Sequence, residues 1–475
     1  MRTDIDELHP QIVQTQDTMH KLTDRGVFGG SLFFLYVALL QVLLFAQGRR
    51  WARARSLAWP TAPSPAPARP WGRLLLLALA GALALLPLTA SAARPISGAR
   101  PWIMVDDDGR AAPDDCDATS RTYGRIQDAL DDARAGDRIS VCPGRYPEAL
   151  RIGRTSSDVY LATEVSFLAI LTPPATDDRP AVDIHDVTRF EMRGFTIRPT
   201  GSVGPVSIGS LRIPGTRACS PAPVAIWVRD ATDVTIRGDN IGSGATCGYL
   251  VGIDATRSTG TISGVQVTDF LARGIVARGG SDLGIDHSDV RFLHAHRDQA
   301  LPGSTLEPEA VGIVIDGVAA ARLRTVNVFT RVPTNPRELI EVLWAGIVIM
   351  DAHGPVSIRG DSVVRRTWRY GIRVIRSNEV SIFNALVQRT YGEGIFLDEL
   401  TGARIVGTDT ESSVTGIHLG PATQGVRINR LRATRSTVID CVDESIGAGT
   451  AGTANIWRRA QGRSSEPVGI CLPAD

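Results

Sequence analysis

The chain has 475 residues, and its 51 Lys and Arg residues nearly cancel its 50 Asp and Glu residues. This balance excludes a protein that binds nucleic acid through a strongly basic surface. The hydrophobic share of 43% is large enough for a core, so the composition also excludes disorder of the whole chain. Only Lys21 is a lysine, and the other 50 basic residues are arginines.

Two uncharged apolar segments follow an N-terminal tail, residues 1–29. Residues 30–47 and 74–93 each approach the ~20 residues that a helix needs to cross a bilayer. The loop between them, 48–73, is rich in Arg and Pro and contains no acidic residue, and basic loops stay in the cytoplasm. We therefore expect two transmembrane helices that place residues 94–475 outside the cytoplasm.

The second apolar segment has another interpretation. Arg69 and Arg73 precede its Leu/Ala run, and its end resembles the cleavage site of a signal peptide, with cleavage after Ala92. Both interpretations export the large domain, which is either held on the cell membrane or secreted. We prefer the anchored form, because a spanning segment rarely precedes a simple signal peptide.

The cysteines offer an independent test of export. All six lie in the segment that we expect to be exported, and they fall in sequence-local pairs. Disulfides are typical of exported proteins, whereas six buried free thiols in a cytosolic protein are the alternative. Six cysteines allow 15 connectivities, which sequence alone cannot decide. Within that limit we predict the pairs Cys116–Cys142, Cys219–Cys247 and Cys441–Cys471.

A Gly-Ile dipeptide recurs through the exported segment with spacings of 22 to 38 residues. The dipeptides begin at Gly252, Gly274, Gly312, Gly346, Gly371, Gly394 and Gly416. Each opens a short segment of alternating apolar residues, and further short apolar segments follow before the next dipeptide. This pattern is typical of strands separated by turns. A period near 22 residues with three short strands predicts one coil of a β-solenoid, with the isoleucines stacked inside. The repeated glycine indicates a positive φ angle or a close approach of chains.

The ends of such a solenoid need covers, because they expose unpaired strand edges. Tyr123–Ala135 has the apolar spacing of a helix and is followed by Gly136, so we expect it to be the N-terminal cap. The 441–471 disulfide would hold the other end. A leucine-rich repeat has a similar period, but it needs a Leu-rich frame that is not visible here.

The segment 126–152, IQDALDDARAGDRISVCPGRYPEALRI, resembles the opening of secreted right-handed parallel β-helix proteins. The Gly-Ile coils resemble the repeats of the pectin-lyase-like superfamily, and the C-terminal stretch resembles the closing coil of its actinobacterial members. The resemblance covers residues 102–475. It implies an all-β, single-stranded parallel β-helix with a cap helix. The superfamily includes polysaccharide lyases, glycoside hydrolases, uronate epimerases, sugar-binding modules and a periplasmic maturation family, so the fold does not decide the function.

Long insertions precede several of the Gly-Ile strands and predict one binding face. The segments 199–223, 294–311 and 331–345 would stand beside these strands, where polysaccharides lie in this superfamily. If each Ile points inward, the next residue points outward. Stacking aromatics, hydrogen-bonding acids and carboxylate-binding arginines suit an acidic sugar chain. The expected substrate-binding residues are Trp227, Arg229, Asp351, Arg373 and His418.

Two outward carboxylates are candidates for catalysis. Asp254 and Asp316 lie two coils apart, at ~4.8 Å per coil, near the ~6.5–9.5 Å carboxylate separation of inverting hydrolases. Arg278 is the accompanying cation. Because the exported segment has no lysine, a lyase with a lysine base is excluded. Each Asp can equally serve a turn at a coil corner.

No complete cofactor or metal motif is present. His294 and His296 could face one side of a strand as a metal pair, but no third ligand is evident. The segment Val105–Gly109 has oxygens suited to calcium without the full spacing of a calcium loop. We therefore expect no cofactor, with calcium as the one candidate. The segment Arg365–Tyr370 could bind an anionic glycan or pack by cation–π contacts.

Together these features predict a membrane-anchored, extracytoplasmic protein that binds and could process an acidic polysaccharide, with no nucleic-acid partner. As an enzyme it would be a polysaccharide lyase, glycoside hydrolase or uronate epimerase. The alternatives are a non-catalytic envelope scaffold or adhesin, and an accessory protein of an envelope complex.

Overall fold

The computed structural model describes residues 102–107, 122–174, 179–200, 224–242, 248–268, 270–292, 310–330 and 343–473, and the backbone of residues 206–208 and 211–213. All of them belong to the second of two units of the chain, Ile96–Asp475. Both expected transmembrane segments lie outside the described residues. Within the described ranges, no helix is long and apolar enough to span a membrane.

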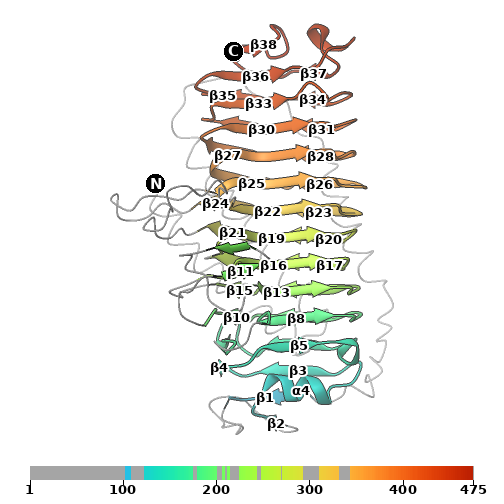
Figure 1. The fold of residues 1–475 in the computed structure, drawn as a ribbon, viewed down its shortest axis with the longest axis vertical. Coiled ribbons are helices and arrows are strands. Elements are labelled where there is room, and N and C mark those ends of the chain that lie inside the picture. The colour runs from blue at the N-terminus through green and yellow to red at the C-terminus, as the bar shows by residue number, and fades with distance from the viewer. Residues whose placement is uncertain are drawn as a thin grey trace, which may run out of the picture. The chain divides into compact units, whose positions relative to one another are not determined.

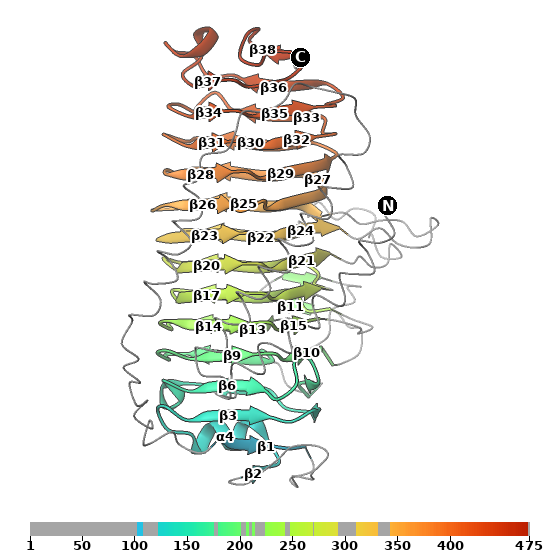
Figure 2. The same ribbon diagram turned by 180° about the vertical axis from the view of Figure 1, so that it is seen from behind.

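The chain winds through successive coils, and each coil adds one short parallel strand to each of three faces (Figures 1 and 2). Face 1 contains the Gly-Ile strands. It consists of β5 (Leu150–Ile152), β8 (Val182–His185), β13 (Val224–Arg229), β16 (Val251–Thr256), β19 (Arg273–Arg278), β22 (Val311–Asp316), β25 (Leu343–Met350), the second part of β27 (Val363–Ile375), β30 (Glu393–Asp398), β33 (Thr415–Leu419), β36 (Ile439–Asp443) and β38 (Ser465–Glu466).

Face 2 is a separate sheet that follows face 1 in each coil. It consists of β2 (Thr122–Tyr123), β1 (Ile103–Val105), β3 (Arg138–Val141), β6 (Tyr160–Thr163), β9 (Glu191–Arg193), β14 (Val234–Arg237), β17 (Thr259–Ser263), β20 (Asp282–Asp286), β23 (Ala320–Arg324), β26 (Val356–Arg359), β28 (Val380–Phe383), β31 (Arg404–Val406), β34 (Arg427–Asn429) and β37 (Ile456–Arg458).

Face 3 completes each coil and leads back to face 1. It consists of β4 (Gly144–Tyr146), β7 (Ala169–Leu171), β10 (Thr196–Ile197), β15 (Asn240–Ile241), β18 (Gln266–Thr268), β21 (Asp289–Phe292), β24 (Asn327–Thr330), the first part of β27, β29 (Leu386–Thr390), β32 (Asp409–Glu411) and β35 (Arg432–Thr434). The remaining strands, β11 (Val206–Ile208) and β12 (Leu211–Ile213), form an antiparallel pair within the first insertion. Single 3₁₀ turns occur at Arg154–Ser156 and Thr450–Gly452.

The isoleucines of the Gly-Ile strands form the interior ladder that the sequence predicts. Ile253 pairs with Ile275, which pairs with Ile313, and the register continues through four further coils to Cys441. Every member of this ladder is fully buried. The stacked apolar side chains bury surface that no single coil could bury, which stabilises the tube.

Each glycine before an interior isoleucine allows two coils to approach closely. A Cβ atom at Gly312 would lie 2.2 Å from Cγ1 of Val328 and 2.7 Å from the carbonyl oxygen of Gly346. The φ angle of Gly312 is not positive. Of the two reasons that the sequence allowed for this glycine, close approach is therefore correct and the left-handed conformation is wrong.

Left-handed residues occur instead at the corners of the coils, among them the corner between faces 2 and 3. One residue at this corner has a positive φ in coil after coil, and its N–H donates to a carbonyl of the next coil, which continues the parallel ladder around the bend. The corner residues include Gly194, Gly238, Gly264, His287, Thr325, Asn384, Gly407 and Arg430. Several of them are not glycine, so a side chain is compatible with this corner.

The N-terminal end is covered by helix α4 (Ile126–Asp132), as expected (Figure 1). The helix is shorter than the predicted Tyr123–Ala135. Tyr123 belongs to β2, which pairs with β1, and Ala133 is extended, so neither continues the helix. The apolar side of the helix, with Ile126 and Leu130 fully buried, closes the interior core.

A distant carboxylate caps helix α4. The oxygens of Glu148 accept the N–H groups of Ile126 and Gln127 at 2.8 and 3.0 Å. These are two of the helix's four unpaired N-terminal donors. Tyr146, two residues earlier, is fully buried and donates its hydroxyl to the carbonyl of Cys142 at 2.9 Å. The Pro-Gly-x-Tyr-x-Glu sequence therefore joins the first coil to its cap.

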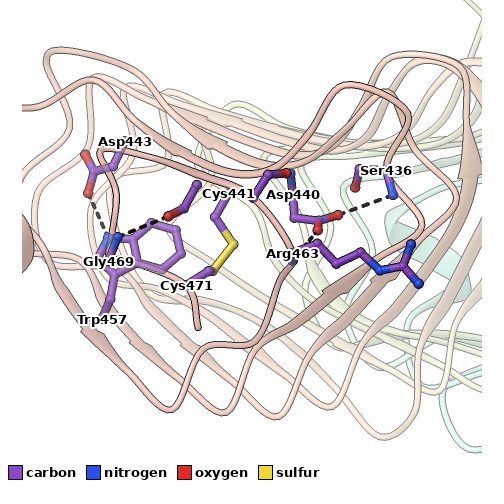
Figure 3. The surroundings of a disulfide bond; sticks show 10 residues. Ser436, Asp440, Cys441, Asp443, Trp457, Arg463, Gly469 and Cys471 are labelled. Carbon is purple, nitrogen blue, oxygen red and sulfur yellow. Dashed lines mark hydrogen bonds between the residues drawn. A yellow bond between two sulfur atoms is a disulfide. The ribbon is translucent and has the colours of Figure 1, made fainter. Parts of the chain in front are cut away.

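A disulfide closes the C-terminal end. Cys441 and Cys471 are joined, as predicted (Figure 3). Nearby, the indole N–H of Trp457 donates to Asp443 at 2.8 Å. Cys142 is also disulfide-bonded, but its predicted partner Cys116 lies outside the described residues. The predicted pair 219–247 lies outside them as well.

Candidate functional site

The strand register places most of the predicted site residues on one outward ladder of face 1. From one coil to the next this ladder contains Asp183, Trp227, Asp254, Val276, Val314, Val348, Arg373, Phe396 and His418. A neighbouring ladder contains Arg229, Thr256, Arg278 and Asp316. The middle of the first ladder is apolar, and its three valines are buried in a second cluster that lies apart from the interior core.

The catalytic candidate Asp254 is held by an arginine. Nε and Nη2 of Arg278 donate to its two carboxylate oxygens at 3.2 and 2.6 Å. The hydroxyl of Thr256 adds a third bond at 3.0 Å, and Asp254 is only 6% exposed. Asp316 pairs in register with Arg278 from the next coil and lies two coils from Asp254. Arg278 therefore lies between the two candidate carboxylates and is bonded to one of them.

Trp227 and Arg229 form a compact group with Asp183. The Arg229 guanidinium lies 4.7 Å from the centre of the Trp227 ring and donates to both oxygens of Asp183 at 3.0 and 3.2 Å. The Trp227 Nε1 atom is buried without a hydrogen-bond partner. Asp351 lies elsewhere, at the corner after β25, where both of its oxygens accept from Arg376 at 2.8 and 2.9 Å.

Aromatic rings gather on the C-terminal half of face 1. The Trp344 and Tyr370 centroids are 5.1 Å apart, Tyr370 and Phe396 are 5.4 Å apart, and Phe396 and His418 are 5.2 Å apart. The Arg373 guanidinium lies 5.5 Å from the centre of the Trp344 ring and 5.0 Å from that of Tyr370. The rings and the arginine form one continuous row across several coils.

Two carboxylates flank His418 at the end of this row. Its Nδ1 lies 3.5 Å from Glu393 Oε1 and its Nε2 lies 3.3 Å from Glu444 Oε1. The interaction with Glu393 raises the pKa of His418 above its ordinary value, both carboxylate charges add to this rise, and burial opposes it. Oε2 of Glu393 and Nε of Arg373 are buried without hydrogen-bond partners. Both atoms are shielded from solvent.

We call Trp344, Tyr370, Arg373, Glu393, Phe396, His418 and Glu444 the aromatic–ionic cluster. The sequence predicted Arg373 and His418, and its rule that the residue after each interior Ile points outward also selects Phe396. It placed Tyr370 in a segment that could bind an anionic glycan, and it missed Trp344, Glu393 and Glu444. Tyr370 and Glu393 each precede a Gly-Ile dipeptide and pair with each other in register. The position before the glycine is thus a second outward position, which the period could have revealed. Trp344 was assigned to the insertion 331–345, but residues 343–345 belong to β25.

A pair of exposed aromatic side chains lies at the bend between faces 3 and 1. Trp368 and Tyr391 are 56% and 62% exposed, and their ring centroids are 5.7 Å apart. Arg369 lies between Trp368 and the buried Tyr370, 5.5 Å from the Tyr370 ring. This pair extends the aromatic surface toward solvent.

In the described part of the chain, no group of three or more His, Cys, Asp or Glu side chains is placed to hold a metal ion. The candidate pair His294 and His296 lies outside these residues. In the suggested calcium segment, Asp107 accepts the N–H of Arg145 at 3.0 Å. Asp108 lies outside the described residues.

No family model matches the chain, and no curated protein sequence does either. Among solved structures, the mannuronan C-5 epimerase AlgE4 A-module of Azotobacter vinelandii is 15% identical, with a TM-score of 0.43, over 76% of this chain and 99% of that chain. A pectin methylesterase of Aspergillus niger is 12% identical, with a TM-score of 0.35, over 67% and 87% of the two chains. Likenesses this weak carry no argument about activity.

The parallel register of all three faces decides the architecture. The described chain is a parallel β-helix. Tailspike protein 2 of the Escherichia coli O157:H7 bacteriophage CAB120 is 12% identical, with a TM-score of 0.33, over 75% of this chain and 40% of that chain. The β-helix itself does not select a function among these proteins.

Proposed function

We propose that this protein binds an acidic polysaccharide along the outer surface of face 1, centred on the aromatic–ionic cluster. The observation that carries the proposal is the row of rings from Trp344 to His418 with Arg373 against it. Aromatic faces offer apolar area for stacking on sugar rings, and a guanidinium binds carboxylates in a bidentate manner. Glu444, whose side chain is 50% exposed, supplies an acceptor for a sugar hydroxyl.

The geometry favours binding over catalysis at Asp254. Arg278 bonds both oxygens of this carboxylate and so occupies the atoms that an acid or base would use. We therefore place any acid–base chemistry at His418 and Glu393, where an imidazole lies beside a carboxylate. The non-catalytic scaffold remains the second candidate function, and the occupied Asp254 is the observation that favours it.

Export and membrane anchoring are also part of the proposal. The Cys441–Cys471 disulfide and the oxidised Cys142 support an oxidising compartment, because thiols stay reduced in most cytosols. The apolar segments 30–47 and 74–93 would provide the anchor.

The test is binding of the full-length protein to polygalacturonate, alginate and neutral dextran by calorimetry, with an assay for new chain ends. Arg373→Gln should weaken binding of the acidic polymers about 10- to 100-fold, because a charge-assisted hydrogen bond contributes about 1.5–3 kcal/mol. The control is Arg322→Gln, a face 2 arginine that pairs with Asp282. Chain ends that appear with wild type and disappear with His418→Gln would show catalysis.

Binding should also depend on pH through His418. Its raised pKa keeps the imidazolium charged above the ordinary histidine range, so affinity for an acidic chain should fall only as pH rises past that range. His418→Gln should remove this dependence. Equal binding of dextran, or an Arg373→Gln variant that binds like wild type, would refute the proposal.

A further inference from the structure

A polar hollow lies away from face 1, at the corner where faces 2 and 3 meet. It has a volume of about 340 Å³, and none of its lining residues belongs to a face 1 strand. Its side chains come from four successive coils and from the loop before β7. They include Ser166, Phe167, Arg193, Arg237, Ser263 and His287.

Two arginines are stacked at this hollow without acids. Arg193 and Arg237 are direct partners in the parallel register of β9 and β14, so their Cα atoms lie about 5 Å apart. In the described part of the chain, neither forms an ion pair with a carboxylate. Elsewhere in the helix, arginines are paired with acids of a neighbouring coil: Arg257 bonds Asp230, and Arg376 bonds Asp351. Like charges on adjacent rungs repel, so a bound anion would relieve a cost that the fold leaves in place.

The acid that follows Gly238 forms no ion pair with these arginines. Asp239 is fully buried beneath the corner, where burial raises its pKa and the charge of Arg193 opposes this rise. In the next coil, Arg237 pairs in register with Ser263. One coil further on, the same position is the acid Asp286, which pairs with Arg324. In the described part of the chain, neither guanidinium group at the hollow is therefore bonded to a carboxylate.

Glycines keep the hollow open. Gly194, Gly238 and Gly264 occupy its left-handed corner in successive coils. Later coils place Asn384 and Arg430 at the same corner, so the conformation alone does not demand glycine. A Cβ atom at Gly238 would meet nothing within 4 Å, so packing does not demand it either. The missing side chains leave space beside the arginines.

The chemistry of the lining restricts the ligand. Arginine offers only donors, and the serine hydroxyls can add two more. A tetrahedral oxyanion ester has three free oxygens to share between two guanidinium forks and a further donor, whereas a carboxylate has two. The hollow exceeds the size of an oxyanion alone, and Phe167, which is 42% exposed, provides a ring face for a sugar. We propose that this hollow binds a phosphate or sulfate ester group carried on a sugar.

The test is calorimetry of the full-length protein with glucose 6-phosphate, glucose 6-sulfate, glucuronate and inorganic sulfate at low salt. Both esters should bind at least tenfold more tightly than glucuronate and inorganic sulfate. Arg193→Gln and Arg237→Gln should each weaken ester binding at least tenfold. Gly238→Asn should do the same by filling the hollow with a side chain that this corner tolerates.

Matched controls separate the site from general charge and from misfolding. Gly402→Asn places the same residue at a left-handed glycine where a Cβ also meets nothing within 4 Å, outside the hollow, and should leave binding unchanged. Arg322→Gln removes one positive charge from face 2 and should also have no effect. No ester binding, or equal weakening by Arg322→Gln, would overturn the site. Equal affinity for inorganic sulfate would overturn its sugar component.

Discussion

Arginine and aspartate pair between coils at many positions of this solenoid. Asp183 with Arg229, Asp254 with Arg278, and Asp351 with Arg376 each join two coils through two parallel N–H···O bonds. A planar guanidinium makes such a fork, whereas an ammonium group does not. This pairing is a physical reason why 50 of the 51 basic residues are arginines and only one is a lysine.

Asp239 should reduce stability at neutral pH. Its Oδ1 accepts the N–H of Phe195 at 2.7 Å, while its buried Oδ2 has no hydrogen-bond partner. Burial raises its pKa, so the folded state binds this proton more tightly than the unfolded state, and stability falls as pH rises through the ordinary Asp range and beyond. Asp239→Asn keeps the acceptor without the charge and should stabilise the fold by about 1–3 kcal/mol at pH 7.

The measurement is the melting temperature of wild type and Asp239→Asn from pH 4 to pH 8. The advantage of the variant should shrink toward pH 4, where the wild-type acid is protonated. Asp230→Asn is the control of opposite sign, because the hydrogen bond with Arg257 lowers the pKa of Asp230. The charged carboxylate of Asp230 stabilises the folded state above the ordinary Asp pKa, and this stabilisation is lost as pH falls through the lowered pKa. A constant advantage of Asp239→Asn at all pH values would contradict the expectation.

The Gly-Ile strand is the element that defines the coil, and its glycine is a steric requirement. Gly312→Ala would place a methyl group 2.2 Å from Val328 and should destabilise the protein by about 1–3 kcal/mol through overpacking. Gly284→Ala in β20 is the matched control, because its Cβ would meet no atom closer than 3.6 Å. Urea unfolding should separate the two variants, and similar midpoints would show that close approach does not explain the repeat.

The molecule as a whole is a stack in which each coil contacts its neighbours, so its ends open most easily. The disulfide joins residues 30 positions apart, and a loop of that length contributes about 3–4 kcal/mol in the chain-entropy model. Replacing Cys441 and Cys471 together by Ser should accelerate hydrogen exchange in β36 and β38. Exchange in β16 and β19, many coils away, should not change. Acceleration spread evenly over all coils would contradict this local effect.

The sequence by itself determined the coil, the inward isoleucines and the outward ladder of face 1. These features depend on apolar burial at a regular period, and burial imposes the same requirement on every coil. The sequence also located the cap helix and the Cys441–Cys471 pair. It overestimated the helix because strand pairing at Tyr123 outweighs the helical spacing of the flanking residues.

Only the tertiary structure decided which outward residues remain available to a ligand. The sequence assigned Asp254 and Arg278 separate roles, but the Arg278 side chain reaches across to the neighbouring coil and bonds Asp254. The cluster of Tyr370, Glu393 and His418 joins two outward ladders, and the spacing of one repeat cannot show that these ladders adjoin. Outward positions carry no common burial requirement, so their partners depend on side-chain reach and on the neighbouring coil, which only the assembled helix specifies.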